Sequence, residues 1–579
     1  MHCPHLKAGK QILKTQDLFF GLNHNLRLRP GELYDMENLS SDLTPVLSTR
    51  PRRGLVASGL RIQGMASRDS LCYVEGSSLV INGTAVDLGL SQKEADCPKQ
   101  LVSMGAWLII LPDKIYINTA NLQDFGPMEA EVTTKDPVTL TQCSLDGGEI
   151  TPDHVGPDTP KAPADRTFWL DTANRQLKQY ASLTGIWVVL ESPLVKLSAP
   201  GIGKAFRDYD GVEISGLPEN SMGDLNGAAI LYGRGENYVI FPGLIEKPLR
   251  GEKPVTVSRR VPRMDFVVES GNRLWGCRYG PDEKGRVVNE LYCSKLGDFR
   301  NWSCYLGIST DSYRVSLGSD GPFTGAVTLG GHPIFFKENC LHKVFGQFPA
   351  NFQVQTTACR GVERGSERSP ALVGEVVCYK SREGICLYDG SIPTLISRNL
   401  GDLLPENAVG GALGSKYYLS GQVAPGAWTL LVYDLEKGLW HREDGLHARF
   451  FEACRNELFC ADDRGNLLAL RGTAGRREEA LPWMAESGLV GVTLPGSRYL
   501  QKLLLRLLLE PGSRIHVLAE YDSCGIWEPV GTVEGMRLQS FTLPVLPRRC
   551  DHFRLRLQGQ GSAKLFSVTR VLSPGGETA

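Results

Sequence analysis

The chain has 579 residues, which is long enough for two to four folded domains, and its 64 Gly, 34 Pro and 42% hydrophobic residues suit a protein rich in strands and turns. Its 63 Lys and Arg nearly balance its 64 Asp and Glu, so the overall charge does not favour a nucleic-acid or membrane partner. The longest apolar runs are far too short to span a bilayer, and the N-terminus lacks the apolar core of a signal peptide, so we expect no membrane-spanning segment.

Fifteen cysteines, an odd number, are scattered singly along the chain. Several of them lie inside strand-like runs, among them Cys72, Cys378, Cys386 and Cys460. This distribution indicates buried, reduced thiols in a protein made in a cytosol.

Residues 1–58 contain many Pro and Asn residues, which predict an extended N-terminal segment. Short strand-like runs such as LRIQGMAS, LCYVE and KIYIN follow in residues 59–130, and turn signals separate them. This regular spacing is interrupted between residues 131 and 258, where a Pro- and Asp-rich stretch precedes less regular strand candidates. We interpret residues 131–258 as an inserted β-rich domain.

The regular spacing returns in residues 259–475, and residues 416–470 show it best, with KYYLSG, WTLLVYDLEKGLWHRED, ARFFEA and ELFCADD. A small antiparallel sheet of this kind cannot bury both of its faces alone, so copies of it must stack. The pattern predicts a β-propeller of about seven blades, including two units before the insertion. The last unit supplies only three strands, and we expect the segment near residues 45–56 to add the fourth and close the ring.

Residues 476–579 contain five or six runs in which apolar and polar residues alternate, as in RIHVLAEYD and HFRLRLQ. Alternation of this kind is typical of strands with one buried face, so a C-terminal β-sandwich is predicted. The expected fold class is therefore all-β: a propeller with an inserted β-rich domain and a C-terminal sandwich.

Several strings in the chain resemble a known family. NRLWGC, YCSKLGDFRNW, VYDLEKGLWHRED, YDSCGIWEPV, PRRCDHFRLRLQGQG and the early MENLSSDLTPVLSTRPRRG are similar to propeller-containing structural proteins of prophages from Gram-positive bacteria. More loosely, the chain resembles the tail-hub or nozzle proteins that stabilise packaged heads in short-tailed phages. The resemblance implies a virion component, and it implies no set of catalytic residues.

Motifs for chemistry are mostly missing from the sequence. It has no phosphate-binding G-x-x-x-x-G-K-[ST] loop, no G-x-S-x-G elbow and no H-E-x-x-H pair. His2, Cys3 and His5 are possible zinc ligands, but no partner with Cys-x-x-Cys spacing follows. We therefore expect no catalytic residues, no cofactor and no metal, and a protein that is not an enzyme.

Basic clusters are the candidate functional residues. Arg50, Arg52 and Arg53 form one cluster, Arg259, Arg260 and Arg263 a second, and Arg548 and Arg549 a third. They could face DNA or a neighbouring subunit; alternatively, they are solvated or paired with nearby acids. Tryptophans could stack on sugars or form blade cores, namely Trp169, Trp275, Trp302, Trp428 and Trp440.

These observations predict a structural component of a tailed-phage virion at the neck or the tail hub or nozzle. We expect it to form a symmetric ring, a hexamer, that stabilises the DNA conduit and touches exiting DNA transiently. Its expected partners are adaptor, tail or tail-fibre proteins, and its expected location is the virion, after assembly in the cytoplasm of the bacterial host. The alternatives are a tail module that binds a cell-surface glycan or receptor, and an enzyme that degrades wall polymers.

Overall fold

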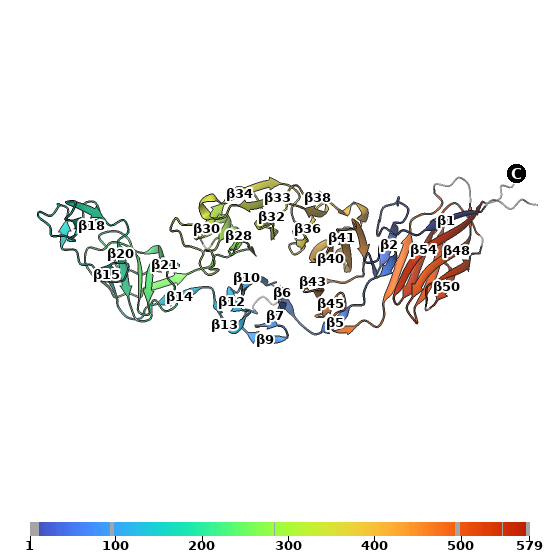
Figure 1. Ribbon diagram of the computed structural model, residues 1–579, viewed down its shortest axis with the longest axis horizontal. Helices are drawn as coiled ribbons and strands as arrows, with labels where there is room; N and C mark the ends of the chain where they lie inside the picture. The colour runs from blue at the N-terminus through green and yellow to red at the C-terminus, as the bar shows by residue number, and fades with distance from the viewer. Residues whose placement is uncertain are drawn as a thin grey trace, which may run out of the picture.

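The structure is a computed structural model that describes residues 11–92, 98–282, 284–492, 498–535, 537–546 and 548–574. It confirms the all-β prediction: the strands form twelve sheets, and the described residues include two short 3-10 turns, η1 (Pro349–Asn351) and η2 (Ser397–Leu400). Within these ranges, no helix has the length and apolar character needed to cross a membrane. Three bodies lie in a row, with a ring of sheets between the insertion and the C-terminal sheets (Figure 1).

Six of the central sheets are antiparallel meanders of four strands. The first two precede the insertion: β6 (Ile62–Arg68), β7 (Ser70–Glu75), β8 (Ser78–Ile81), β9 (Thr84–Asp87); β10 (Gln100–Met104), β11 (Trp107–Leu111), β12 (Ile115–Asn118), β13 (Asn121–Pro127). The other four follow it: β27 (Phe266–Glu269), β28 (Leu274–Pro281), β29 (Val287–Cys293), β30 (Tyr313–Ser316); β31 (Gly325–Leu329), β32 (His332–Lys337), β33 (Cys340–Phe345), β34 (Gln353–Ala358); β35 (Ala371–Val373), β36 (Val376–Ser381), β37 (Gly384–Tyr388), β38 (Thr394–Leu395); β39 (Glu406–Leu413), β40 (Lys416–Ala424), β41 (Ala427–Asp434), β42 (Leu439–Arg442).

The seventh central sheet is built from both parts of the chain. It consists of β43 (Ala448–Cys454), β44 (Glu457–Asp462), β45 (Leu467–Ala469), then β5 (Gly54–Ala57) and β46 (Arg476–Arg477). Leu55 of β5 pairs with Leu468 of β45, so the early segment supplies the fourth strand, which is the pairing that the sequence predicts.

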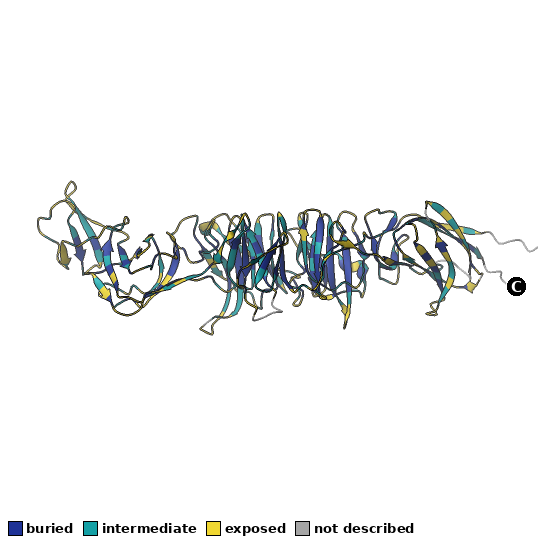
Figure 2. Cartoon of the chain, turned by 90° about the horizontal axis from the view of Figure 1, so that it is seen from below, coloured by how far each residue is buried: buried dark blue, intermediate teal, exposed yellow. Residues whose placement is uncertain are grey.

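The first strands of these sheets contact one another in a closed order: β6, β10, β27, β31, β35, β39, β43 and again β6. Apolar side chains fill the space between neighbouring sheets; for example, Leu79 and Ile110, from the first two sheets, are fully buried in one cluster. Figure 2 shows many buried residues along the strands of the central sheets. The arrangement is propeller-like, because sheets repeated around a closed ring leave only short, protected edges.

The insertion consists of three further sheets. Two of them share a core that includes Leu140, Val195 and Val257: β14 (Ala130–Thr133), β26 (Thr256–Arg259), β21 (Gly211–Ser215), β22 (Gly227–Ile230); β23 (Gly233–Gly235), β24 (Tyr238–Pro242), β20 (Leu194–Ser198), β15 (Val138–Cys143), β25 (Leu249–Gly251). The third consists of β16 (His154–Gly156), β17 (Phe168–Asp171), β18 (Gln176–Ala181) and β19 (Ile186–Val189).

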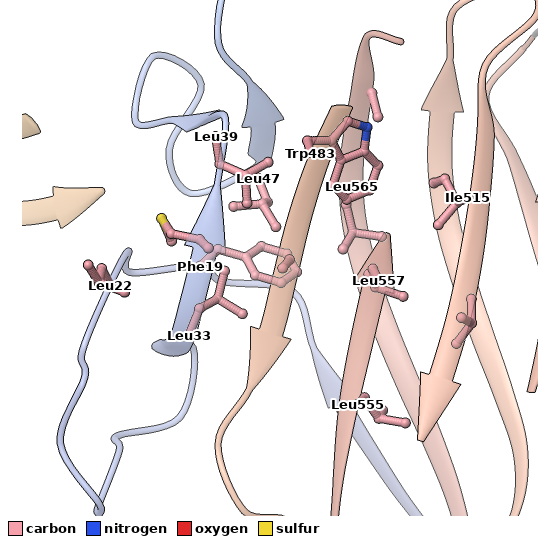
Figure 3. Packing of buried hydrophobic residues seen from close by; sticks show 14 of the residues in the cluster. Phe19, Leu22, Leu33, Leu39, Leu47, Trp483, Ile515, Leu555, Leu557 and Leu565 are labelled. Carbon is pink, nitrogen blue, oxygen red and sulfur yellow. The ribbon is translucent and has the colours of Figure 1, made fainter. Parts of the chain in front are cut away.

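Two sheets form the C-terminal body, and the N-terminal segment adds strands to both. One has the order β3 (Leu39–Ser40), β4 (Leu47–Thr49), β54 (Ala563–Pro574), β48 (Arg498–Leu509), β51 (Gln539–Pro544), with β1 (Ile12–Gln16) on β54 and β52 (Arg549–Cys550) on β48. The other has the order β2 (Leu33–Glu37), β47 (Pro482–Ser487), β53 (Phe553–Gln560), β49 (Arg514–Tyr521), β50 (Trp527–Glu534). Phe19 and Leu33 pack with Leu557 and Leu565 in their shared core (Figure 3).

No disulfide joins any two of the thirteen cysteines within the described ranges. Nine strand cysteines and Cys304 are buried, as the sequence interpretation expects, while Cys340 and Cys359 are partly exposed and Cys524 is exposed.

A glycine allows the closing strand to enter the ring. A Cβ atom on Gly54 would lie 1.8 Å from the carbonyl oxygen of Ala474, so no larger residue fits without moving the backbone of the following loop. Gly318 is a useful comparison, because a Cβ atom there would meet no atom within 4 Å.

We predict that Gly54→Ala lowers the thermal midpoint measurably, because overpacking of a buried site costs about 1–3 kcal/mol. Gly318→Ala should leave the midpoint unchanged. Scanning calorimetry of both variants beside the unmodified protein measures the difference. Equal midpoints for the two variants would show that β5 does not hold the ring closed.

Candidate functional site

The first predicted basic cluster is mostly buried. Arg50 and Arg53 are 4% and 3% exposed. Arg50 Nη1 lies 2.8 Å from Glu478 Oε2, and Arg53 lies 2.8 Å from Glu443 Oε2 and 2.8 Å from Asp444 Oδ2. The prediction that Arg50 and Arg53 face DNA is therefore wrong for this structure, because both guanidinium groups are buried in ion pairs with carboxylates of the same chain. The cluster ties the residues before β5 to the loop after β42 and to the residues after β46.

Electrostatics favour the charged forms of Arg53 and Asp444. Burial alone would raise the pKa of Asp444, but the Arg53 guanidinium outweighs it and holds that pKa below its usual range. Burial would likewise lower the pKa of Arg53, and the carboxylates of Asp444 and Glu443 raise it instead. The pairing is thus a folded-state interaction that the unfolded chain lacks.

The second basic cluster lies where the insertion leaves the ring. Arg259 is 4% exposed, and its Nη1 is 2.5 Å from Asp210 Oδ2, so it too is buried and not available to DNA. Arg260 is paired with Glu131 at the surface. Arg263 is exposed, and no hydrogen bond or ion pair with another described residue occupies its guanidinium group.

The third cluster lies in the C-terminal body, together with the partner of Arg52. Arg52 Nη2 is 2.8 Å from Glu510 Oε2, and Arg548 is paired with Glu528. Arg549 is exposed on β52. The structure therefore does not gather the eight arginines on one surface, and most of them are paired with acids, which was the alternative interpretation.

Most of the tryptophans named from the sequence are core residues. Trp440, Trp275, Trp302 and Trp169 are each at most 4% exposed. Trp428 is partly exposed, and its ring stacks on His447 with centroids 3.4 Å apart and planes 10° apart.

The described ranges contain no group of three or more His, Cys, Asp or Glu that could hold a metal ion. His2, Cys3 and His5 lie outside the described residues.

A pocket that the sequence analysis missed lies where the first and last central sheets meet. It has a volume of about 370 Å³ and is lined by the segment before β6, the start of β43 and the turn between β44 and β45. Three of its lining residues are arginines: Arg61, Arg449 and Arg464. We call it the arginine pocket.

Two aspartates also line the arginine pocket. Asp462 Oδ1 accepts hydrogen bonds from the backbone N–H groups of Arg464 (3.0 Å) and Asn466 (2.7 Å), so it holds the turn in shape. Asp463 Oδ2 lies 3.2 Å from Nδ1 of His447, which places the stacked Trp428 and His447 beside the pocket.

The arginine pocket depends on ring closure. Arg61 is separated from Arg449 by almost the whole propeller-like ring, and they approach each other because β43 contacts β6. The lone arginines give no local motif in the sequence. Their proximity could be predicted only from the expectation that the last and first sheets of the ring are neighbours.

Glu452 is a carboxyl group on a ring strand for which the described residues supply no ion-pair partner. Glu452 lies on β43, and burial raises its pKa to about 8, although a hydrogen bond from the Ser67 backbone opposes this. Sequence inspection could not single it out, because its shift comes from its surroundings.

Comparison with known protein families gives no match, and comparison with curated proteins also gives none. Among solved structures, an exo-β-1,3-galactanase from Phanerochaete chrysosporium is similar over 53% of this chain and 94% of its own, with 9% identity and a TM-score of 0.22. A glycoside hydrolase aligns over 52% and 83%, with 11% identity and a TM-score of 0.17. A family 43 arabinoxylan arabinofuranohydrolase from Bacillus subtilis aligns over 53% and 94%, with 9% identity and a TM-score of 0.15.

These neighbours correct one expectation from the sequence. The protein was expected not to be an enzyme, and that expectation is contradicted because the similar structures are glycoside hydrolases. At these identities and TM-scores, the alignments assign neither a substrate nor catalytic residues to this chain.

We predict that Arg53→Met destabilises the protein by about 3–5 kcal/mol, because it leaves the buried carboxylates without their main partner. Arg260→Met removes a surface pair whose side chains are 58% and 47% exposed, and it should cost less than about 1 kcal/mol. Thermal melts of both variants test this. Similar losses in the two variants would contradict the claim that the buried cluster joins the bodies.

Glu452→Gln should stabilise the protein at alkaline pH. The folded-state pKa of Glu452, about 8, lies above the unfolded value, so the folded state binds the proton more tightly and Glu452 costs stability as pH rises through that range. The gain in melting temperature should therefore grow from about pH 5 to about pH 8.5. Glu436→Gln, at an exposed turn, is the control, and a gain that does not change with pH would refute the assignment.

Proposed function

We propose that this protein is a structural component of a tailed-phage virion, placed at the neck or at the tail hub or nozzle. In this proposal it assembles with copies of itself in a symmetric ring, a hexamer, and contacts adaptor, tail or tail-fibre proteins. This ring of subunits would stabilise the conduit through which DNA leaves, with transient contact to that DNA. The sequence resemblance supports the class of protein, and the arrangement of its bodies supports the mechanical role.

The observation that carries the proposal is that two different β bodies extend from opposite ends of a closed ring (Figure 1). Copies arranged around a rotational axis need two different, complementary surfaces, one for each neighbour. A closed ring of sheets whose edges are short and protected is a rigid centre for such surfaces. The two ends of this chain supply them.

The proposal also includes the blade count and the fold of the C-terminal body. We infer that the seven central sheets are the blades of a seven-bladed propeller and that the two C-terminal sheets form a β-sandwich. The closed order of contacts supports the first inference, and the shared core of the two C-terminal sheets supports the second. The domains would be residues 59–130 with 259–475, residues 131–258, and residues 476–579, with residues 1–58 shared between propeller and sandwich.

The outermost sheet of the insertion offers an apolar contact surface. Ile186 and Val188 on β19 are 56% and 48% exposed, and Leu183 in the preceding turn is fully exposed. Strand β19 is also an edge, since it pairs with β18 on one side only. Exposed apolar edge strands are usually covered by a partner. In the proposal, that partner is the neighbouring virion protein.

We predict that the double change Ile186→Lys and Val188→Lys leaves folding intact, because both side chains are exposed, but blocks incorporation into particles. Charged groups on this surface would have to be desolvated on contact, which is costly. Val287→Lys, at a valine that is 70% exposed on β29, is the matched control. Immunoblots of purified particles measure incorporation, and thermal melts measure folding.

Normal particle content in the double variant would exclude this contact. Cleavage of a wall polymer by the purified protein, with particle assembly unaffected, would instead favour the enzymatic alternative.

A second candidate function is a tail module that binds a cell-surface glycan or receptor. The arginine pocket and the adjacent Trp428–His447 stack favour it, because a partly exposed aromatic ring beside polar groups suits a saccharide. Binding of the isolated protein to host cell walls, lost in Trp428→Ala, would support this candidate.

A further inference from the structure

We propose that the arginine pocket binds an oxyanion, that is, a phosphate, sulfate or carboxylate group of its ligand. The inference rests on the pocket alone, and it holds whether or not the protein is a virion component.

The guanidinium groups that line the pocket have no protein partner. Within the described ranges, no hydrogen bond or ion pair joins the side chain of Arg61, Arg449 or Arg464 to another residue. This sets them apart from the predicted basic clusters, where most arginines are paired with carboxylates. Guanidinium groups present several N–H donors in a planar fork that matches the oxygens of phosphate, sulfate and carboxylate.

Within the described residues, the two aspartates of the pocket form no ion pair with these arginines. Both oxygens of Asp462 accept hydrogen bonds from its own turn: Oδ1 from backbone N–H groups, and Oδ2 from Nδ2 of Asn466 at 2.8 Å. Asp463 faces His447 instead. With three arginines and two aspartates, the lining has a formal surplus of one positive charge.

A fourth arginine adds to the positive charge. Arg368 Nη1 donates a 2.7 Å hydrogen bond to the backbone oxygen of Arg449, and its guanidinium lies 4.9 Å from the centre of the Phe450 ring. Desolvation and the positive charge of Arg449 both lower the pKa of Arg368, and together they outweigh the opposing effect of the nearby Glu367 carboxylate. A bound anion would relieve this repulsion.

The pocket has both the size and the rigidity for such a ligand. Its volume of about 370 Å³ exceeds that of a single oxyanion, so it has room for the group that carries the anion. The turn of residues 462–466 is fixed to the segment before β6 by a 2.9 Å hydrogen bond from Leu60 N–H to the Gly465 oxygen. Gly465 has φ of +79°, and a Cβ atom there would lie 2.6 Å from the Leu60 oxygen, so the close approach requires glycine.

The test is calorimetric titration of the full-length protein with inorganic phosphate, sulfate and glucuronate at low ionic strength. We expect saturable binding of at least one anion, with a Kd of about 1 mM or tighter, weakening as salt is added. Preference for phosphate or sulfate would indicate a tetrahedral ester in the natural ligand, and preference for glucuronate would indicate a uronic acid.

Two variants with matched chemistry decide the assignment. The double change Arg449→Gln and Arg464→Gln should weaken binding at least about tenfold, since each charge-assisted hydrogen bond contributes substantially. Arg382→Gln is the control, because Arg382 is also an exposed arginine in the turn between the second and third strands of a central sheet, β36 and β37. Thermal melts without ligand confirm folding. Absence of saturable binding for all three anions, or equal affinity in the double variant and the control, would overturn the proposal.

Discussion

The structure depends on the return of the N-terminal segment to the end of the ring. Strand β5 completes the sheet that begins with β43, and the contact of β43 with β6 then closes the ring. Just before β5, Arg50 is paired with Glu478, in the residues that lead into the C-terminal body, and Arg53 is paired with Glu443, in the loop after β42. Closure therefore fixes the ring, the joint to the C-terminal sheets and the arginine pocket at the same time.

The same closure explains why Arg53 is held in ion pairs within the chain while Arg61 lines a pocket. Arg53 lies where three segments meet, so its charge is buried and satisfied by Glu443 and Asp444. Arg61, a few residues later, is exposed beside the closing junction, and no hydrogen bond or ion pair joins its side chain to another residue in the described ranges. Buried ion pairs add modest net stability but penalise other arrangements strongly, because a lone buried charge is costly. Whether an arginine forms a structural ion pair, as Arg53 does, or lines the arginine pocket, as Arg61 does, therefore depends on where it lies at the closing junction and not on its local sequence.

Much of the fold could be predicted from the sequence. Runs such as KYYLSG and WTLLVYD are long, apolar and bounded by turns, so they indicate the strands that the structure places at β40 and β41. The sequence does not indicate strands β1–β3, and β4 pairs in the C-terminal body although residues 45–56 are predicted to close the ring. These strands are short, and their partners β47 and β54 lie more than four hundred residues away. The candidate site was harder. Arginine clusters are visible in a sequence, but their burial and partners come from tertiary contacts, so Arg50, Arg53 and Arg259 could not be separated from surface arginines.

The mechanical role proposed for the protein requires its two ends to meet different neighbours. The most direct measurement is a cryo-EM reconstruction of intact particles in which this chain is located and its copies are counted. We expect a ring of copies on the particle axis, with β16–β19 against one neighbour and the C-terminal sheets against another. A reconstruction in which the protein is off the axis, or is attached through one end only with the arginine pocket facing the surroundings, would contradict it.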